Sequence, residues 1–276
     1  MTLLAAHLND AGLLITDGEH ILCREPGFAL LEDDGLVTGR EAWASASLTP
    51  RRIQNRYWSQ LTTEPLADAR FRHLSAADLV SEQLSTLWQK VAKPGDRLAL
   101  AVPGYMDNAS LGLVLGIAMD LDIPVVGMVD AAVAATRREY DNAVPVHVDL
   151  GLHSAMLTRL SQDGQVQFER SAIVDEAGML NLYSLWLRVI AETFVQQSRF
   201  DPLHTAETEQ ALQDNMLGWL TLASSRDTVP MEVEYRGITH RAELDSIEFM
   251  SAANPVYQSI VSNLRALYRA EDTPAI

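Results

Sequence analysis

The sequence predicts an α/β fold in which mixed sheets are flanked by helices. With 276 residues, 47% of them hydrophobic, the chain can form a large core and two structural units. Residues 97–139 show a strand, helix, strand, helix pattern, which is typical of a parallel βαβ unit. A group of short strands followed by helices occurs twice, once on each side of about residue 143. These three observations favour two related α/β units.

The first half opens with short strands that are separated by polar turns. Leu3–Leu8 and Leu13–Thr16 flank the turn Asn9-Asp10-Ala11-Gly12, and Ile21–Cys23 follows a second turn at Asp17-Gly18. Leu74–Val91 is predicted to be a helix because its apolar residues fall on one broad face.

The βαβ unit follows that helix. Arg97–Val102 and Pro124–Val129 are predicted strands, and Ser110–Leu121 is a predicted helix capped by Asn108 or Ser110. Asp130–Glu139 is a predicted helix with Asp130 as its N-cap.

Pro145 is expected to mark a break, after which the second half repeats the strand group. Two long helices, a hairpin around Arg236-Gly237 and a final helix interrupted at Pro255 are expected to follow. The predicted strands are Val146–Leu150, Ala155–Leu160, Gln165–Ile173, Pro230–Tyr235 and Ile238–Ala242, and the predicted helices are about Leu180–Arg199, Leu203–Leu220 and Asp245–Ala270.

The composition excludes several classes of protein. A net charge of −16 argues against nonspecific nucleic-acid binding, which depends on basic residues. No apolar stretch is long enough to cross a bilayer, and the N-terminal residues lack the basic region of a signal peptide. A single cysteine, Cys23, fits a reducing compartment. We therefore expect a cytoplasmic protein without membrane or nucleic-acid partners.

Several segments together resemble a known family. Ala101-Val102-Pro103-Gly104-Tyr105 ends a predicted strand, and the alanine-rich segment Val129–Ala135 follows the next strand. With Asp34–Ala42, Glu207–Leu220 and Tyr235–Glu243, their order resembles the nucleotide-binding domain of Hsp70 chaperones and, more distantly, actin and FtsA.

The resemblance implies an actin-like (ribonuclease H-like) fold of two lobes. It implies lobe I at 1–142 with a small subdomain at about 30–73, and lobe II at 143–276 with a small subdomain at about 201–245. The second lobe is expected to be shortened, because the family's adenosine-binding Gly-Gly segment is expected to start where Ile276 lies.

The family holds the phosphates of ATP between two turns. Its first turn, Asp-Leu-Gly-Thr-Thr, corresponds here to residues 5–9, which read Ala-Ala-His-Leu-Asn, so the magnesium-directing Asp, the glycine and both threonines are absent. Asp10 and Gly12 are candidates for a shifted replacement. In the second turn Asp149 and Gly151 match the family, and Ser154 stands at a threonine position.

Other family residues are also replaced. Leu152 and His153 stand at two glycine positions, where bulky side chains would crowd a phosphate. The lysine expected within Arg52–Trp58 is absent, and the water-orienting glutamate falls at Val129. Because phosphoryl transfer depends on positioning and electrostatics, these losses favour a protein that does not hydrolyse ATP.

The resemblance therefore implies a pseudo-ATPase that acts as a non-catalytic interaction or scaffold protein, with no cofactor. One alternative is a nucleotide-binding, Hsp70-like ATPase or chaperone-like protein that uses ATP or ADP with Mg²⁺. In that case Asp10, Gly12, Asp149, Gly151 and Ser154 would bind the nucleotide. A second alternative is a small-molecule sensor that uses the cleft between the lobes.

Two further groups of residues suggest a metal site and a partner surface. His147, Asp149 and His153 suggest a metal site, but no fourth ligand is evident, so we expect a plain structural turn and no metal. Trp43, Tyr57 and Trp58 are expected to pack in a core, with a partner surface as the alternative. The expected partner is another protein or a second copy, and a dimer is the simplest arrangement.

Overall fold

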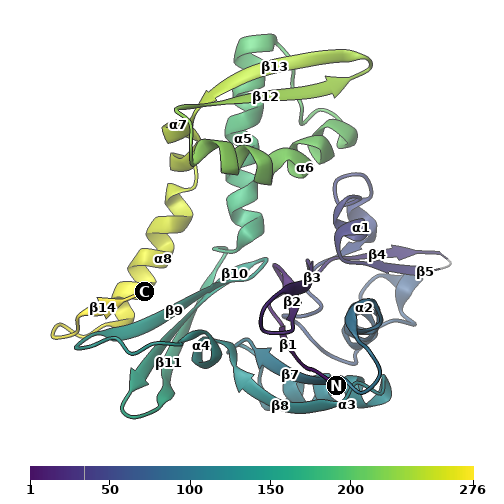
Figure 1. Cartoon of the computed structure of the whole chain (residues 1–276). Coiled ribbons are helices and arrows are strands. Elements are labelled where there is room, and N and C mark those ends of the chain that lie inside the picture. Colours follow the sequence, from purple (N-terminus) through teal and green to yellow (C-terminus); the bar gives the residue numbers. More distant parts are fainter. Residues whose placement is uncertain (34) are drawn as a thin grey trace.

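The computed structural model describes residues 1–33 and 35–276 and has the predicted α/β class, with mixed sheets flanked by helices. Two larger sheets lie at the base of the view in Figure 1, and smaller units stand above each of them. Asp34, the first residue of the Asp34–Ala42 match, lies outside the described residues.

The first sheet has the strand order β3-β2-β1-β7-β8. β1 pairs antiparallel with β2 and parallel with β7, and β7 pairs parallel with β8, so the predicted βαβ unit is confirmed. The strands are β1 (Leu3–His7), β2 (Leu13–Thr16), β3 (Ile21–Glu25), β7 (Arg97–Val102) and β8 (Val125–Asp130).

Two helices connect strands of this sheet, and their caps explain where they begin. α2 (Ala76–Val91) begins with a capping box formed by Ser75 and Asp78. In α3 (Asn108–Asp120) the predicted cap was wrong, since neither Asn108 nor Ser110 is the N-cap. Asp107 takes this role, and its carboxylate accepts a hydrogen bond from the Ser110 N–H.

The second sheet repeats the arrangement of the first, with the order β11-β10-β9-β14. β9 pairs antiparallel with β10 and parallel with β14, as β1 does with β2 and β7. Pro145, expected at a break, is the second residue of β9. The strands are β9 (Val144–Leu150), β10 (Ser154–Gln162), β11 (Val166–Asp175) and β14 (Pro274–Ala275).

The short helix α4 (Ala131–Ala135) lies against strands of both sheets. Asp130 caps α4, as predicted, by accepting hydrogen bonds from Ala132 N and Val133 N. The helix ends four residues before Glu139, the predicted end.

A small unit follows the first three strands. Its sheet has the order β5-β4-β6, and its elements are β4 (Ala29–Glu32), β5 (Gly35–Thr38), β6 (Ile53–Gln54), α1 (Arg40–Trp43) and the 3₁₀ turns Pro50–Arg52 and Ala69–Phe71.

The corresponding unit of the C-terminal half stands at the top of Figure 1, where α5 rises to it from the second sheet. The hairpin turn at Arg236-Gly237 has positive φ at both residues, 51° and 76°, which suits the twist of paired strands. The final helix is interrupted near Pro255, as predicted. The elements are α5 (Met179–Ser198), α6 (Ala206–Ala223), β12 (Thr228–Tyr235), β13 (Ile238–Asp245), α7 (Ser246–Ser251) and α8 (Asn254–Leu267).

Across residues 1–33 and 35–276, the buried apolar side chains form two large clusters and one small one. One large cluster lies within residues 4–123 and the other within residues 146–267. The small cluster joins Phe28, Leu30 and Ala42 of the first half to Leu152 of the second. In the described part of the chain, the helices are all too short or too polar to cross a membrane.

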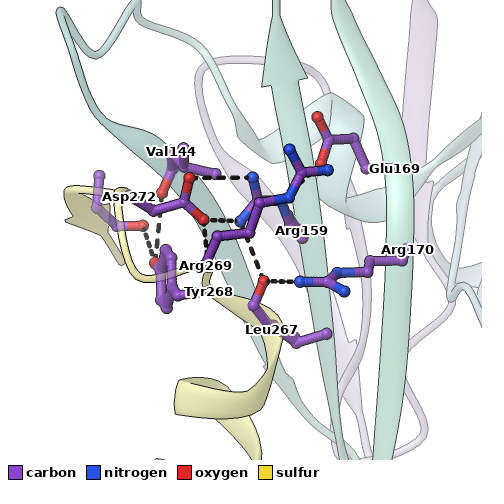
Figure 2. A network of polar contacts seen from close by, with 9 residues as sticks. Val144, Arg159, Glu169, Arg170, Leu267, Tyr268, Arg269 and Asp272 are labelled. Atoms are coloured by element: carbon purple, nitrogen blue, oxygen red, sulfur yellow. Dashed lines mark hydrogen bonds and ion pairs between the residues drawn. The ribbon is translucent and has the colours of Figure 1, made fainter.

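A buried arginine fixes the segment that follows α8 (Figure 2). Arg159 on β10 is 4% exposed and forms ion pairs with Glu169 and Asp272. Its guanidinium also donates to the carbonyl of Leu267 at 3.0 Å, and Arg170 donates to the same oxygen. Asp272 in turn accepts a hydrogen bond from Arg269 N, so the chain after α8 is held against the sheet.

Candidate functional site

The candidate site lies where the turn after β1 meets the turn between β9 and β10. The Asn9 side chain first shapes its own turn, because its Oδ1 accepts a hydrogen bond from Ala11 N at 2.8 Å. This contact directs Asn9 Nδ2 toward the second half, where it donates to Asp149 Oδ1 and to the Leu150 carbonyl at 3.0 Å. One amide side chain therefore joins the two turns.

Asp10 makes the second connection between the turns. Its Oδ1 accepts a hydrogen bond from Leu152 N at 2.7 Å, and the residue is only 3% exposed. A Cβ atom on Gly151 would lie 2.9 Å from Asp10 Oδ1 and 3.2 Å from the carbonyl of Ser154. The close approach of Asp10 therefore requires glycine at position 151.

The second turn is held from three further directions. Leu152 is 3% exposed and packs into the small apolar cluster of the first half. His153 Nε2 lies 3.1 Å from the Asn55 carbonyl and 3.0 Å from Asn55 Oδ1, so a protonated Nε2 donates to Asn55. At the start of α5, Met179 N and Leu180 N donate to the carbonyls of Gly151 and Leu152 at 2.9 and 3.0 Å.

The carboxylates at this junction have shifted pKa values. Burial raises the pKa of Asp10 from 3.8 to about 6; the hydrogen bond from Leu152 opposes this shift, and the charge of Asp149 adds to it. Burial, the largest influence on Asp149, would raise its pKa, but His7, Asn9 and the charge of His147 together lower it. Asp149 is therefore the more readily ionised of the two carboxyls.

Two histidines lie next to Asp149. His7 Nε2 lies 3.4 Å from Asp149 Oδ2 and has no hydrogen-bond partner within the described residues. Burial lowers the pKa of His147, and the charge of Asp149 opposes that shift. His7 and His147 come from β1 and β9, the first strands of the two sheets.

The space left between the turns is very small. The cavity has a volume of about 20 Å³, enough for one water molecule. Tyr105 Oη is buried there without a hydrogen-bond partner among the described residues, which a water molecule would satisfy. The lining residues are Asn9, Asp10, Ser59, Pro103, Tyr105, Asp149, Gly151, His153, Ser154 and Met156.

A second contact joins the small units of the two halves further out. Gln210 on α6 accepts a hydrogen bond from Ser47 N at 2.9 Å and donates to the Trp43 carbonyl at 3.2 Å. The rings of Trp43 and Tyr183 meet edge to face, with centroids 5.6 Å apart. Two open cavities of about 340 and 370 Å³ adjoin Trp43, and both are also lined by Glu209.

The structure brings together most of the residues that the sequence suggested for nucleotide binding. Asp10, Asp149, Gly151 and Ser154 line one cavity. Gly12 is not among the residues that line it, and a Cβ there would contact the side chain of Arg24.

The aromatic group of Trp43, Tyr57 and Trp58 is divided between the core and the lining of the two open cavities. Tyr57 and Trp58 are buried, and both donate to Gln83 Oε1 at 2.7 Å, so they do not form a surface here. Of the three residues, Trp43 alone is partly exposed, and its ring packs edge to face on Phe28 with the centroids 4.7 Å apart. Among the described residues, no group of three or more potential ligands has metal-site geometry, and His153 turns to Asn55 instead.

Sequence reasoning missed four residues of the junction, namely His7, Asn9, Asn55 and Tyr105. The polar pair Asn9-Asp10 directly after a strand was the available signal for the first turn. Asn55 gave no signal, because it lies 98 positions from its partner His153.

Searches with family models and among curated proteins found no match to this chain.

Proposed function

We propose that this chain is a non-catalytic relative of the Hsp70 nucleotide-binding domain, built on the actin-like two-lobed fold. The repeated sheet order supports this fold, since each half places an antiparallel meander beside a strand parallel to its first strand. The small units in each half, with their contact through Gln210 and Trp43, correspond to the small subdomains that the resemblance implies.

The observation that carries the proposed loss of ATPase activity is the direct bonding of the two turns. In the Hsp70 family these turns hold phosphates between them. Here Asn9 and Asp10 bond to Asp149, Leu150 and Leu152, which leaves about 20 Å³. The Asp10 carboxylate accepts the Leu152 N–H, a kind of donor that phosphate-binding turns offer to an anion. Because the pKa of Asp10 is about 6, the chain supplies its own anion to the second turn at neutral pH and above.

The charge at the junction also disfavours a triphosphate. Two carboxylates and neither lysine nor arginine are among the described residues that line the cavity. Phosphate binding requires charge neutralisation, by metal or by cationic side chains, and two carboxylates beside a buried phosphate repel it.

We further propose that the protein acts through a protein partner or by self-association. α3 is apolar on most of its circumference, and its outward side chains Leu115 and Met119 are 42% and 74% exposed. An apolar helix is normally covered on all sides, so an uncovered side supports a role in association. Light scattering at increasing concentration tests whether the partner is a second copy.

Calorimetric titration with ATP and with ADP, each with Mg²⁺, tests the proposed function. We expect no saturable heat at nucleotide concentrations up to about 1 mM, which corresponds to a binding free energy weaker than about −4 kcal/mol. Saturable, magnesium-dependent binding that is lost in Asp149→Ala would instead establish the nucleotide-binding alternative. The matched control is Asp33→Ala, an exposed carboxylate outside the junction.

A further inference from the structure

The junction places a carboxylate from each half of the chain in one buried site. Asp10 belongs to the first half and Asp149 to the second, and both line the same cavity of about 20 Å³. Within the described residues, no lysine or arginine forms an ion pair or hydrogen bond with Asp10. When the two turns meet, Asp10 therefore exchanges water for one N–H donor and a neighbouring carboxylate.

We propose that Asp10 is a proton-controlled latch between the two halves, so that closing the junction takes up a proton at Asp10 and acid favours the closed arrangement. This inference does not rest on the proposed function, because no nucleotide takes part in it. It concerns the equilibrium between the bonded and separated arrangements of the two turns. The same contact would regulate access to any molecule that binds between the halves.

The sign of the effect follows from the difference in solvation between the two arrangements. In an open arrangement Asp10 is solvated and titrates near its ordinary value of about 3.9. In the closed arrangement its pKa is about 6, chiefly because of burial. At pH values between these two pKa values, closure therefore binds a proton. The equilibrium constant for closure rises about ten-fold from pH 7.5 to pH 5.

The groups around Asp10 do not reverse this sign. Tyr57 and Tyr105 face Asp10, and burial raises the pKa of both well above 10, so they stay neutral. Asp149 remains ionised at pH 5 because its pKa is lowered. His7, from the first half, contacts Asp149 across the junction, with its Nε2 3.4 Å from Asp149 Oδ2.

Two more histidines belong to the same junction. His147 lies beside Asp149 within the second half, and burial lowers its pKa. Burial and the charge of Arg56 lower the pKa of His153, so its protonation, which would oppose closure, lies further toward acid.

Double electron–electron resonance between the halves tests the latch. Nitroxide labels at Ile21→Cys on β3 and Ile238→Cys on β13 occupy exposed sites in opposite halves, away from the α3 surface, in a Cys23→Ser background. We expect the ratio of the population at the closed distance to the population at the open distance to rise about ten-fold from pH 7.5 to pH 5. In Asp10→Asn, which keeps an oxygen acceptor for Leu152 N without the charge, we expect the closed distance at both pH values.

His7→Gln tests whether the contact between His7 and Asp149, and not Asp10, carries the effect. If Asp10 is the latch, His7→Gln keeps most of the change in closed population between pH 7.5 and pH 5. Loss of the whole change in His7→Gln would assign it to His7 and overturn the proposal. The proposal would also be overturned if Asp10→Asn showed the full change in closed population between the two pH values. The same holds if the wild type gave one distance distribution at both pH values.

A measurement on the unsubstituted protein avoids any effect of the variants on folding. Hydrogen exchange at the Leu152 amide, corrected for the intrinsic pH dependence of exchange, reports directly on the bond to Asp10. We expect about ten-fold greater protection at pH 5 than at pH 7.5. Equal or lower protection at pH 5 contradicts the latch.

Discussion

Leu152 joins the two halves of the chain through one apolar side chain. It is 3% exposed and packs into the apolar cluster that Phe28, Leu30 and Ala42 form in the first half. Truncating a fully buried leucine typically costs about 2–5 kcal/mol, because contacts are lost and a cavity remains. We therefore expect Leu152→Ala to lower the free energy of unfolding by about 3 kcal/mol in urea titration.

Leu217 provides the matched control for that measurement. It is 69% exposed on α6, so Leu217→Ala should change the unfolding free energy by less than about 0.5 kcal/mol. Equal effects of the two substitutions would show that Leu152 does not hold the halves together.

The sequence predicted part of this residue-level arrangement. The bulk of Leu152 and His153 in the second turn was visible from the sequence. Their partners Phe28 and Asn55 were not, because nothing local links residues so distant in the chain. The burial of Asp10 was hidden for the same reason, since its donor Leu152 N lies 142 positions away.

At the scale of elements, the start of α5 depends on Gly178. A Cβ there would lie 2.5 Å from backbone atoms of Leu152 and His153, and backbone cannot move aside cheaply. We expect Gly178→Ala to lower the thermal midpoint by more than about 5 °C, since a loss of about 2–3 kcal/mol shifts a protein of this size by that amount. Differential scanning calorimetry measures this shift.

Gly218→Ala is the control for the same chemical change. No atom of the residues that the structure describes lies within 4 Å of the added Cβ in α6. Alanine also favours a helix interior over glycine by about 1 kcal/mol. This variant should therefore be slightly more stable than the parent. A similar loss in both variants would exclude the docking of α5 on the turn as the cause.

The Arg159 network anchors the last element of the second sheet. Arg159→Leu would leave the Asp272 carboxylate without its cationic partner and the Leu267 carbonyl without the donor at 3.0 Å. We expect faster hydrogen exchange across residues 268–276, detected by mass spectrometry. Arg241→Leu removes an exposed pair with Glu232 and should leave exchange there unchanged. Unchanged exchange in both variants would show that Arg159 does not fix this segment.

Most elements were predictable because their patterns are local. Arg97–Val102 is confirmed residue for residue as β7, and the Asp130 cap is confirmed. α4 is shorter than predicted because Gln162 binds the chain that follows it, donating to the Arg138 carbonyl and accepting from Tyr140 N. Such a tertiary contact overrides local helix propensity and is not visible in the sequence of the helix itself.

At the scale of the whole molecule, placing glycine at both bulky positions of the second turn should not produce catalysis. We expect Leu152→Gly combined with His153→Gly to show no magnesium-dependent ATP hydrolysis above background in a phosphate-release assay. Asn9 and Asp10 would still fill the junction, and lysine and arginine are absent from the described residues lining it. Turnover by this double variant would mean that the two side chains were the main obstacle. The unsubstituted chain is the control and should show the same background rate.

The bond between Asp10 and Leu152 can form only after both residues have been synthesised. A ribosome adds about 5–20 residues per second, so the 142 positions between the two residues take roughly 7–28 s to translate. Throughout that interval the first three strands exist without the turn that later covers them, and Phe28 and Leu30 lack the leucine that completes their cluster. The nascent N-terminal half must therefore remain free of aggregation with its future contact surface open, and a codon change that slows elongation between positions 10 and 152 lengthens that exposure in proportion.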